Sequence, residues 1–135
     1  MKLRLRGNSL RLRLTKSEVV QLADAGVVSE TTGFGPSPEQ QLHYCLRVIP
    51  MTSALIVTFT ERRIEVGLPS FLAQQWMRTE QISLHAEQAI DAEQILSILV
   101  EKDFVCLQPR VNEDDQDGFP NPKADLKPGL GICHD

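Results

Sequence analysis

The sequence predicts an α+β domain in which two helices pack against a mostly antiparallel β-sheet, or a partly open barrel, of about six or seven strands. Two patterns carry this prediction. Leucine alternates with basic residues across residues 2–14, and apolar residues alternate again between residues 41 and 68, a period of two that is typical of strands. Two shorter segments instead show helix-start signals followed by apolar residues at helical spacing. Short connections between the strands disfavour a doubly wound α/β fold.

Residues 2–14 are expected to form a β-hairpin. The leucines occupy odd positions up to Leu5 and even positions from Leu10 onward, so a straight strand would place half of them on the wrong face. A two-residue turn at Gly7-Asn8 keeps all of them on one face, and glycine at its first position suits a type II′ turn. A single strand bulged at Gly7 is the alternative. The hairpin register would pair Lys2 with Arg13, Leu3 with Leu12, Arg4 with Arg11 and Leu5 with Leu10.

A helix is predicted over residues 16–25. Thr15 and Glu18 form a capping box at its start, and Gly26 can end it in the left-handed region. Residues 29–39 contain two glycines and two prolines and are interpreted as mostly loop. Alternating apolar residues predict strands over 42–48, 54–59, 64–68 and 81–86. Periodicity alone does not classify the apolar run 95–100, which is interpreted as a strand from its length and its isoleucine and valine. A second helix is predicted to begin at Pro69 with Phe71, Leu72, Gln75 and Trp76 on one side. Phe71, Leu72 and Trp76 are expected to meet the leucine face of the hairpin in one core.

Length and composition indicate one domain. The chain has 135 residues, of which 41% are apolar and 5% aromatic, so its core would consist mainly of Leu, Ile and Val. A chain of this length buries enough surface to be stable without disulfides or metals. We expect the domain to span residues 1–110, and residues 111–135, first acidic and then rich in Pro and Gly, to form a tail outside the core. No internal repeat is visible in the sequence.

The sequence favours a cytoplasmic location. No apolar run approaches the ~20 residues that cross a bilayer, and the basic N-terminus lacks the continuous apolar stretch of a signal peptide. Cys45, Cys106 and Cys133 form no CxxC pair. An odd, sparse set of cysteines is typical of reduced thiols rather than of a disulfide framework.

Four segments are distinctive when taken together: the opening KLRLRGNSLRLRLTKSEVVQL, the central IEVGLP, and ILVEKDFVCL followed by EDDQDGFPNP. The opening and the stretch from EKDF to FPNP are the specific parts. Together they resemble a family of small bacterial proteins classed as a domain of unknown function. The resemblance runs along nearly the whole chain, as far as Pro122. It implies a small, one-domain, cytoplasmic bacterial protein, and it carries over no activity, ligand, partner or site residue.

The cationic face of the expected hairpin is the first candidate site. Arg4, Arg6, Arg11 and Arg13 would stand close together there, and like charges opposed across strands destabilise a sheet. Three interpretations remain open: a solvated surface, an intramolecular partner in the acidic residues 113–117, and an external phosphate or carboxylate, which a guanidinium fork binds through two oxygens. Nucleic acid is disfavoured because the net charge is −4 and aromatic residues are few.

Other candidate residues have less support. Glu101 and Asp103 follow an apolar run, where they could serve as acid or base, although such clusters more often only solvate a turn. Residues 113–118 match the start of a calcium-binding loop but lack its closing glutamate. His43 with Cys45 has no recognised zinc spacing. No metal or cofactor is therefore predicted, and no familiar catalytic motif identifies an enzyme.

Three functions follow from these features. The first is a non-enzymatic binding or regulatory module whose arginine face takes an anionic partner, either a protein or a small molecule. The second is an enzyme that acts on a small phosphate or carboxylate substrate. The third is a protein-interaction domain whose arginine face is covered by its own acidic tail until a partner displaces it. No membrane partner is expected, and the residues do not identify a substrate.

Overall fold

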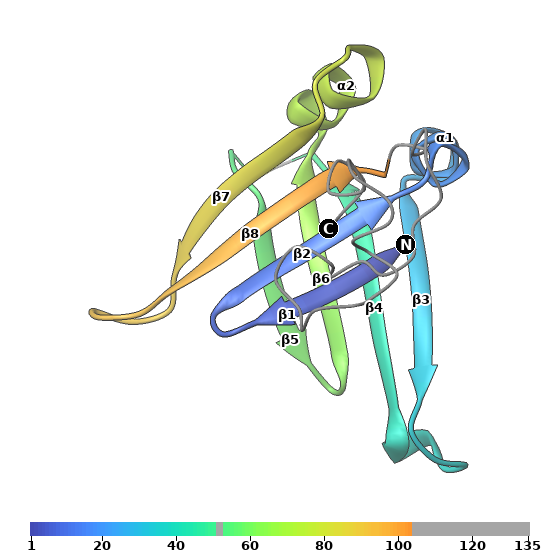
Figure 1. Ribbon diagram of the computed structural model, residues 1–135, viewed down its shortest axis with the longest axis vertical. Helices are drawn as coiled ribbons and strands as arrows, with labels where there is room; N and C mark the ends of the chain where they lie inside the picture. Colours follow the sequence, from blue (N-terminus) through green and yellow to red (C-terminus); the bar gives the residue numbers. More distant parts are fainter. Residues whose placement is uncertain (51–52, 104–135) are drawn as a thin grey trace, which may run out of the picture. The chain divides into compact units, whose positions relative to one another are not determined.

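The computed structural model describes residues 1–50 and 53–103, which form an α+β unit (Figure 1). The predicted fold class and its two helices are confirmed, and the described residues contain eight strands rather than six or seven. The elements are β1 Lys2–Arg6, β2 Ser9–Leu14, α1 Lys16–Ala25, β3 Val27–Gly33, a 3-10 turn η1 Pro38–Gln40, β4 Gln41–Ile49, β5 Ile56–Thr60, β6 Arg63–Pro69, α2 Ser70–Arg78, β7 Ser83–Ala89 and β8 Ile95–Lys102.

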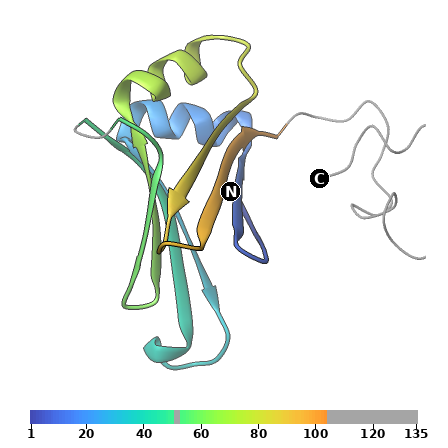
Figure 2. The same ribbon diagram turned by 90° about the vertical axis from the view of Figure 1, so that its left-hand side faces the viewer.

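The strands form two four-stranded sheets. The first sheet has the order β1-β2-β8-β7 and the second has the order β3-β4-β6-β5. In each sheet the two central strands are parallel and each outer strand is antiparallel to its neighbour, so antiparallel pairs predominate, as predicted. The sheets pack face to face around one apolar core. Both helices lie at the same end of the sheets, where the chain leaves β2 and β6 (Figure 2).

The element order reveals a structural repeat that the sequence does not display. A ββαββ unit, β1-β2-α1-β3-β4, is followed by a second one, β5-β6-α2-β7-β8. Each unit contributes one hairpin to each sheet, so the two units are intertwined rather than side by side. The register repeats as well: Lys2 pairs with Arg13, and the residues 54 positions later, Ile56 and Gly67, pair with each other.

The repeat escapes sequence inspection because burial constrains the polarity of a position more than its identity. Most residues 54 positions apart in the shared core differ in side chain. Tight packing then requires each half to fit the shape of the other. The equivalent buried pairs are Leu10 with Ile64, Leu12 with Val66, Leu14 with Leu68, Leu22 with Trp76, and Leu46 with Val100.

The opening hairpin and the first helix agree with the sequence-based expectation. The register of β1 and β2 is the predicted one at every pair. Gly7 has a φ of 53°, whereas Asn8 does not have a positive φ, which is the φ pattern of a type II′ turn. The Thr15–Glu18 capping box is present, and Gly26, with a φ of 78°, ends α1 in the left-handed region.

Three local predictions were wrong. Residues 29–39 were expected to be mostly loop, but β3 extends to Gly33 because it pairs along its whole length with β4. Phe71 was expected in the core and is 58% exposed, while Ala73 is buried in its place next to Trp76. Leu5 was expected on the buried leucine face but is 59% exposed.

The compact unit that the structure describes ends at Asp103. The predicted boundary between residues 110 and 111 lies outside the described residues and stays a prediction, as do the acidic residues 113–117. Neither of the described helices is long and apolar enough to cross a membrane. Cys45 is a buried free thiol, and the other two cysteines lie outside the described part of the chain.

Candidate functional site

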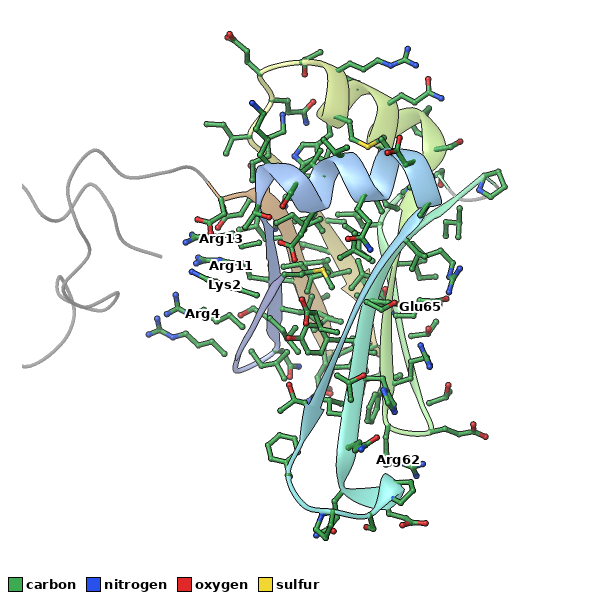
Figure 3. All side chains as sticks on the ribbon, turned by 90° about the vertical axis from the view of Figure 1, so that its right-hand side faces the viewer. Lys2, Arg4, Arg11, Arg13, Arg62 and Glu65 are labelled. Atoms are coloured by element: carbon green, nitrogen blue, oxygen red, sulfur yellow. The ribbon has the colours of Figure 1, made fainter. Side chains whose placement is uncertain are left out.

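The outer face of the first sheet, which points away from the second sheet, carries the predicted site residues. Strand alternation places the leucines of β2 in the core and its arginines on this face. Figure 3 shows Lys2, Arg4, Arg11 and Arg13 projecting from the same side of the hairpin. The register arranges the outer face in three cross-strand rows: the Arg13 row (Lys2, Arg13, Glu101, Ser83), the Arg11 row (Arg4, Arg11, Leu99, His85) and the Ser97 row (Arg6, Ser9, Ser97, Glu87).

The charges of the Arg13 row are largely compensated within the fold. Nε and Nη2 of Arg13 donate to the same carboxylate oxygen, Oε1 of Glu101, at 3.0 and 2.7 Å. Lys2 Nζ lies 3.8 Å from Oδ2 of Asp103. Arg13 is only 9% exposed, so this pairing is partly shielded from solvent. Within the described residues, the basic face is therefore paired with Glu101 in β8 and with Asp103 just after it, the two residues that the sequence suggested as acid or base.

Arg11, in the neighbouring row, also lies close to Glu101 of the Arg13 row. Its Nε lies 3.5 Å from Glu101 Oε1, a carboxylate oxygen that already accepts two hydrogen bonds from Arg13. Its Nη1 is buried and has no hydrogen-bond partner among the described residues. A buried charged donor without an acceptor costs about 1–3 kcal/mol or more. Arg11 therefore has an unmet requirement for an acceptor.

The residues of the Arg11 and Ser97 rows, except Glu87, line an open pocket of about 230 Å³. Arg4 and Arg6 border it and make no ion pair within residues 1–50 and 53–103, and no acidic side chain belongs to its lining. The lining residues are Arg4, Arg6, Ser9, Leu10, Arg11, His85, Ser97 and Leu99. Guanidinium groups around an acid-free pocket favour a ligand with oxygen acceptors and negative charge.

His85 and Ser97 are two pocket residues that the sequence reasoning missed. His85 Nε2 and Ser97 Oγ lie 3.3 Å apart, on β7 and β8. Ser97 interrupts an apolar run at an outward-facing position, which is a weak sign of a role on that face. The parallel pairing of β2 with β8, which brings Ser97 beside the arginines, has no local sequence signal.

The equivalent face of the second sheet has a different chemistry. Arg47 Nε donates to Glu65 Oε1 at 3.1 Å, and the Cys45 thiol lies 3.6 Å from the same oxygen. Burial and, secondarily, the Glu65 charge and this hydrogen bond raise the pKa of Cys45, so its thiol stays protonated and unreactive near neutral pH. His43 Nδ1 bonds Thr31 Oγ1 at 2.8 Å instead of joining Cys45 at a metal site.

No group of three or more His, Cys, Asp or Glu residues within the described ranges is placed to hold a metal ion. The calcium-like residues 113–118 lie outside those ranges. The arginine-lined pocket is the candidate site within the described ranges.

Fold and pocket together define a class of small α+β protein, built from two intertwined ββαββ units, with an arginine-rich pocket on one sheet. The chain belongs to DUF7009, a family of unknown function whose model matches residues 1–123. This confirms the resemblance to a domain of unknown function noted in the sequence. No curated protein and no solved structure matches the chain.

Proposed function

We propose that this protein is a binding module that takes a small anionic ligand on the outer face of its first sheet. The observation that carries the proposal is the lining of the pocket, to which Arg11 contributes a guanidinium and no acidic residue belongs. Arg4, directly opposite Arg11 on β1, adds a second guanidinium, and Arg6 adds a third. An anion in the pocket would offset the repulsion between these like charges and accept hydrogen bonds from their guanidinium groups.

The proposal omits Arg13, which sequence reasoning grouped with the other arginines. Arg13 is engaged by Glu101 and nearly buried, so its replacement would disturb the sheet before it disturbed a ligand. The test of the proposal must therefore change Arg4 and Arg6 and leave Arg13 in place. Both residues lie on the edge strand β1, where a change of side chain has few packing consequences.

Two alternatives have less support. An enzyme that uses Glu101 or Asp103 as acid or base would need these carboxylates free, whereas they lie within 4 Å of basic groups from β1 and β2. An acidic tail that covers the arginines would place residues 113–117 on this face, and those residues lie outside the described part of the chain. We also propose a cytoplasmic setting, which the free thiol of Cys45 supports.

The test is calorimetric titration of the full chain with orthophosphate and with succinate, at two salt concentrations. We expect binding that weakens at higher salt, because partly exposed charges are screened. Replacing Arg4 and Arg6 with glutamate should weaken binding about tenfold or more, since each lost charge-assisted hydrogen bond contributes about 1.5–3 kcal/mol.

The matched control replaces Arg63 and Arg78 with glutamate, which makes the same change in net charge at exposed positions away from the pocket. Equal loss in both double variants would reduce the effect to overall charge and refute a site on the first sheet. A third protein that lacks residues 111–135 tests the tail: tighter binding after its removal would favour the self-covered alternative.

A further inference from the structure

We propose that the anionic group recognised by this pocket is a phosphate monoester, and that the Ser97 hydroxyl, positioned by His85, contributes to its recognition. This inference rests on the proposed anion-binding function and specifies its ligand class. It uses two residues, on β7 and β8, that play no part in the ion pairs of the Arg13 row.

The first argument is the direction of the donors. Guanidinium groups reach the pocket from β1 and β2, and the Ser97 hydroxyl reaches it from β8. A carboxylate has two oxygens in one plane and is satisfied by a single guanidinium fork. A phosphate has three terminal oxygens that diverge tetrahedrally, so it can accept from donors on several strands at once. The spread of donors over three strands therefore fits a phosphate better than a carboxylate.

The second argument is charge. Arg4, Arg6 and Arg11 line the pocket with no acidic residue, and Glu101 offsets Arg11 only in part, at 3.5 Å. A phosphate monoester carries about −1.5 to −2 charges at neutral pH, whereas a carboxylate carries one. The excess of positive charge in the pocket is therefore matched more closely by the phosphate.

The third argument concerns the hydroxyl protons. Ser9 and Ser97 both line the pocket, but the Ser9 hydroxyl donates to the backbone oxygen of Arg6 at 2.6 Å, so its only proton is engaged. Ser97 lies 3.3 Å from His85 Nε2. With the imidazole proton on Nε2, His85 donates to Ser97, and the Ser97 hydroxyl proton is then available to a phosphate oxygen.

The fourth argument is the surface between the arginines and the histidine. Leu99 stands on the outer face between Arg11 and His85 in the same cross-strand row. Its side chain lines the pocket without polar atoms. Leu99 therefore suits the organic portion of a phosphate ester, which inorganic phosphate lacks.

The experiment compares phenyl phosphate with benzoate, two probes that share a ring and differ in their anionic group, by calorimetric titration of the full chain at low salt. We expect phenyl phosphate to bind at least about tenfold more tightly. Ser97→Ala should weaken phenyl phosphate about threefold to tenfold, as expected for one hydrogen bond, and leave benzoate nearly unchanged. Ser83→Ala, on the same outer face of β7 but outside the pocket lining, is the matched control and should change neither affinity, with circular dichroism confirming that both variants fold.

The outcomes separate this inference from the function on which it rests. One outcome is equal affinity for the two probes, with binding of both lost when Arg4 and Arg6 are replaced by glutamate. That result would support an anion site but overturn its assignment to phosphate. A preference for phenyl phosphate that survives Ser97→Ala would remove Ser97 from the site. Absence of binding by either probe, together with a flat titration with orthophosphate and succinate, would overturn the proposed function as well.

Discussion

Arg13 and Glu101 lie directly opposite each other on the parallel strands β2 and β8, and both donors of the arginine meet one oxygen of the carboxylate. The second sheet has a related contact with the charges exchanged. Glu65 and Arg47 occupy the positions equivalent to Arg11 and Glu101, 54 residues away in each case, and they too form an ion pair. An ion pair across the parallel central strands is therefore common to both sheets, whereas the pocket lined by three arginines lies on the first sheet.

The Arg13–Glu101 pair should contribute measurably to stability. Glu101→Gln leaves Arg13 nearly buried beside a neutral partner, and we expect it to lower the free energy of unfolding by about 2 kcal/mol. Arg13→Gln with Glu101→Gln should cost less than the sum of the single changes, because the second change removes the group left unpaired by the first. Urea denaturation measures all three values. Arg47→Gln with Glu65→Gln, at a more exposed pair, should cost less than about 1 kcal/mol and serves as the comparison.

The turn between β5 and β6 is strained and can be improved. Glu61 and Arg62 have φ values of 48° and 65°, although both carry bulky side chains that disfavour this region. Positive φ at both central positions is the pattern of a type I′ turn, for which Asn-Gly is the preferred pair. Glu61→Asn with Arg62→Gly should therefore raise the free energy of unfolding by about 1 kcal/mol. Thermal and urea denaturation check this, and unchanged stability would contradict the strain.

The turn between β1 and β2, at Gly7-Asn8, is equivalent to the turn between β5 and β6 and allows a substitution that should lower stability. Gly7 has a φ of 53° and open space where a Cβ would stand, so a substitution there meets backbone strain and no steric clash. Gly7→Ala should therefore lower the free energy of unfolding by about 1 kcal/mol. A neutral result would mean that the hairpin adjusts its turn at no cost.

Cys45 should resist thiol reagents until the protein unfolds. Burial, followed by the charge of Glu65 and the hydrogen bond to it, raises the pKa of this thiol. In a Cys106→Ser, Cys133→Ser background, iodoacetamide should label Cys45 only in denaturant. Because the folded pKa is raised, the associated stability is present below the unfolded value, about 8.5, and is lost as the pH rises through the folded value. Cys45→Ala should flatten that part of the alkaline stability curve, and rapid labelling of the native protein would disprove the assignment.

Glu18 should govern part of the acid sensitivity. Burial alone would raise its pKa, but hydrogen bonds from the Met1 amino group and from Thr15 lower it overall. A lowered pKa means that the stability from this carboxylate is present above its ordinary value and is lost as the pH falls through the folded value. Glu18→Gln should therefore flatten the decline in stability below about pH 4.5. The control is Glu39→Gln, at an exposed position of η1, which should leave the curve unchanged.

The elements predicted best are those whose signals are local. Alternation and the Gly7-Asn8 turn determined the register of the first hairpin, because a two-residue turn permits only one pairing that keeps the leucines together. Thr15, Glu18 and Gly26 marked the ends of α1 for the same reason, since capping depends on residues within one turn of the helix. The full length of β3 was not predicted from the sequence, because this strand is stabilised by pairing with β4 rather than by an alternating apolar pattern of its own.

What the sequence determined by itself is which side chains share a face: leucines inward and arginines outward along the hairpin. Tertiary structure alone decided what lies beside them. Glu101 reaches Arg13 across 88 residues of chain. Ser97 and His85 join the arginines because β8 pairs with β2, and β7 with β8, once the two halves intertwine. Alternation specifies a buried face but not its neighbour, because any apolar strand of suitable length can complete a sheet. The neighbour is chosen by packing of the whole core, and that choice separates Arg13, held in an ion pair, from Arg4, Arg6 and Arg11 around the pocket.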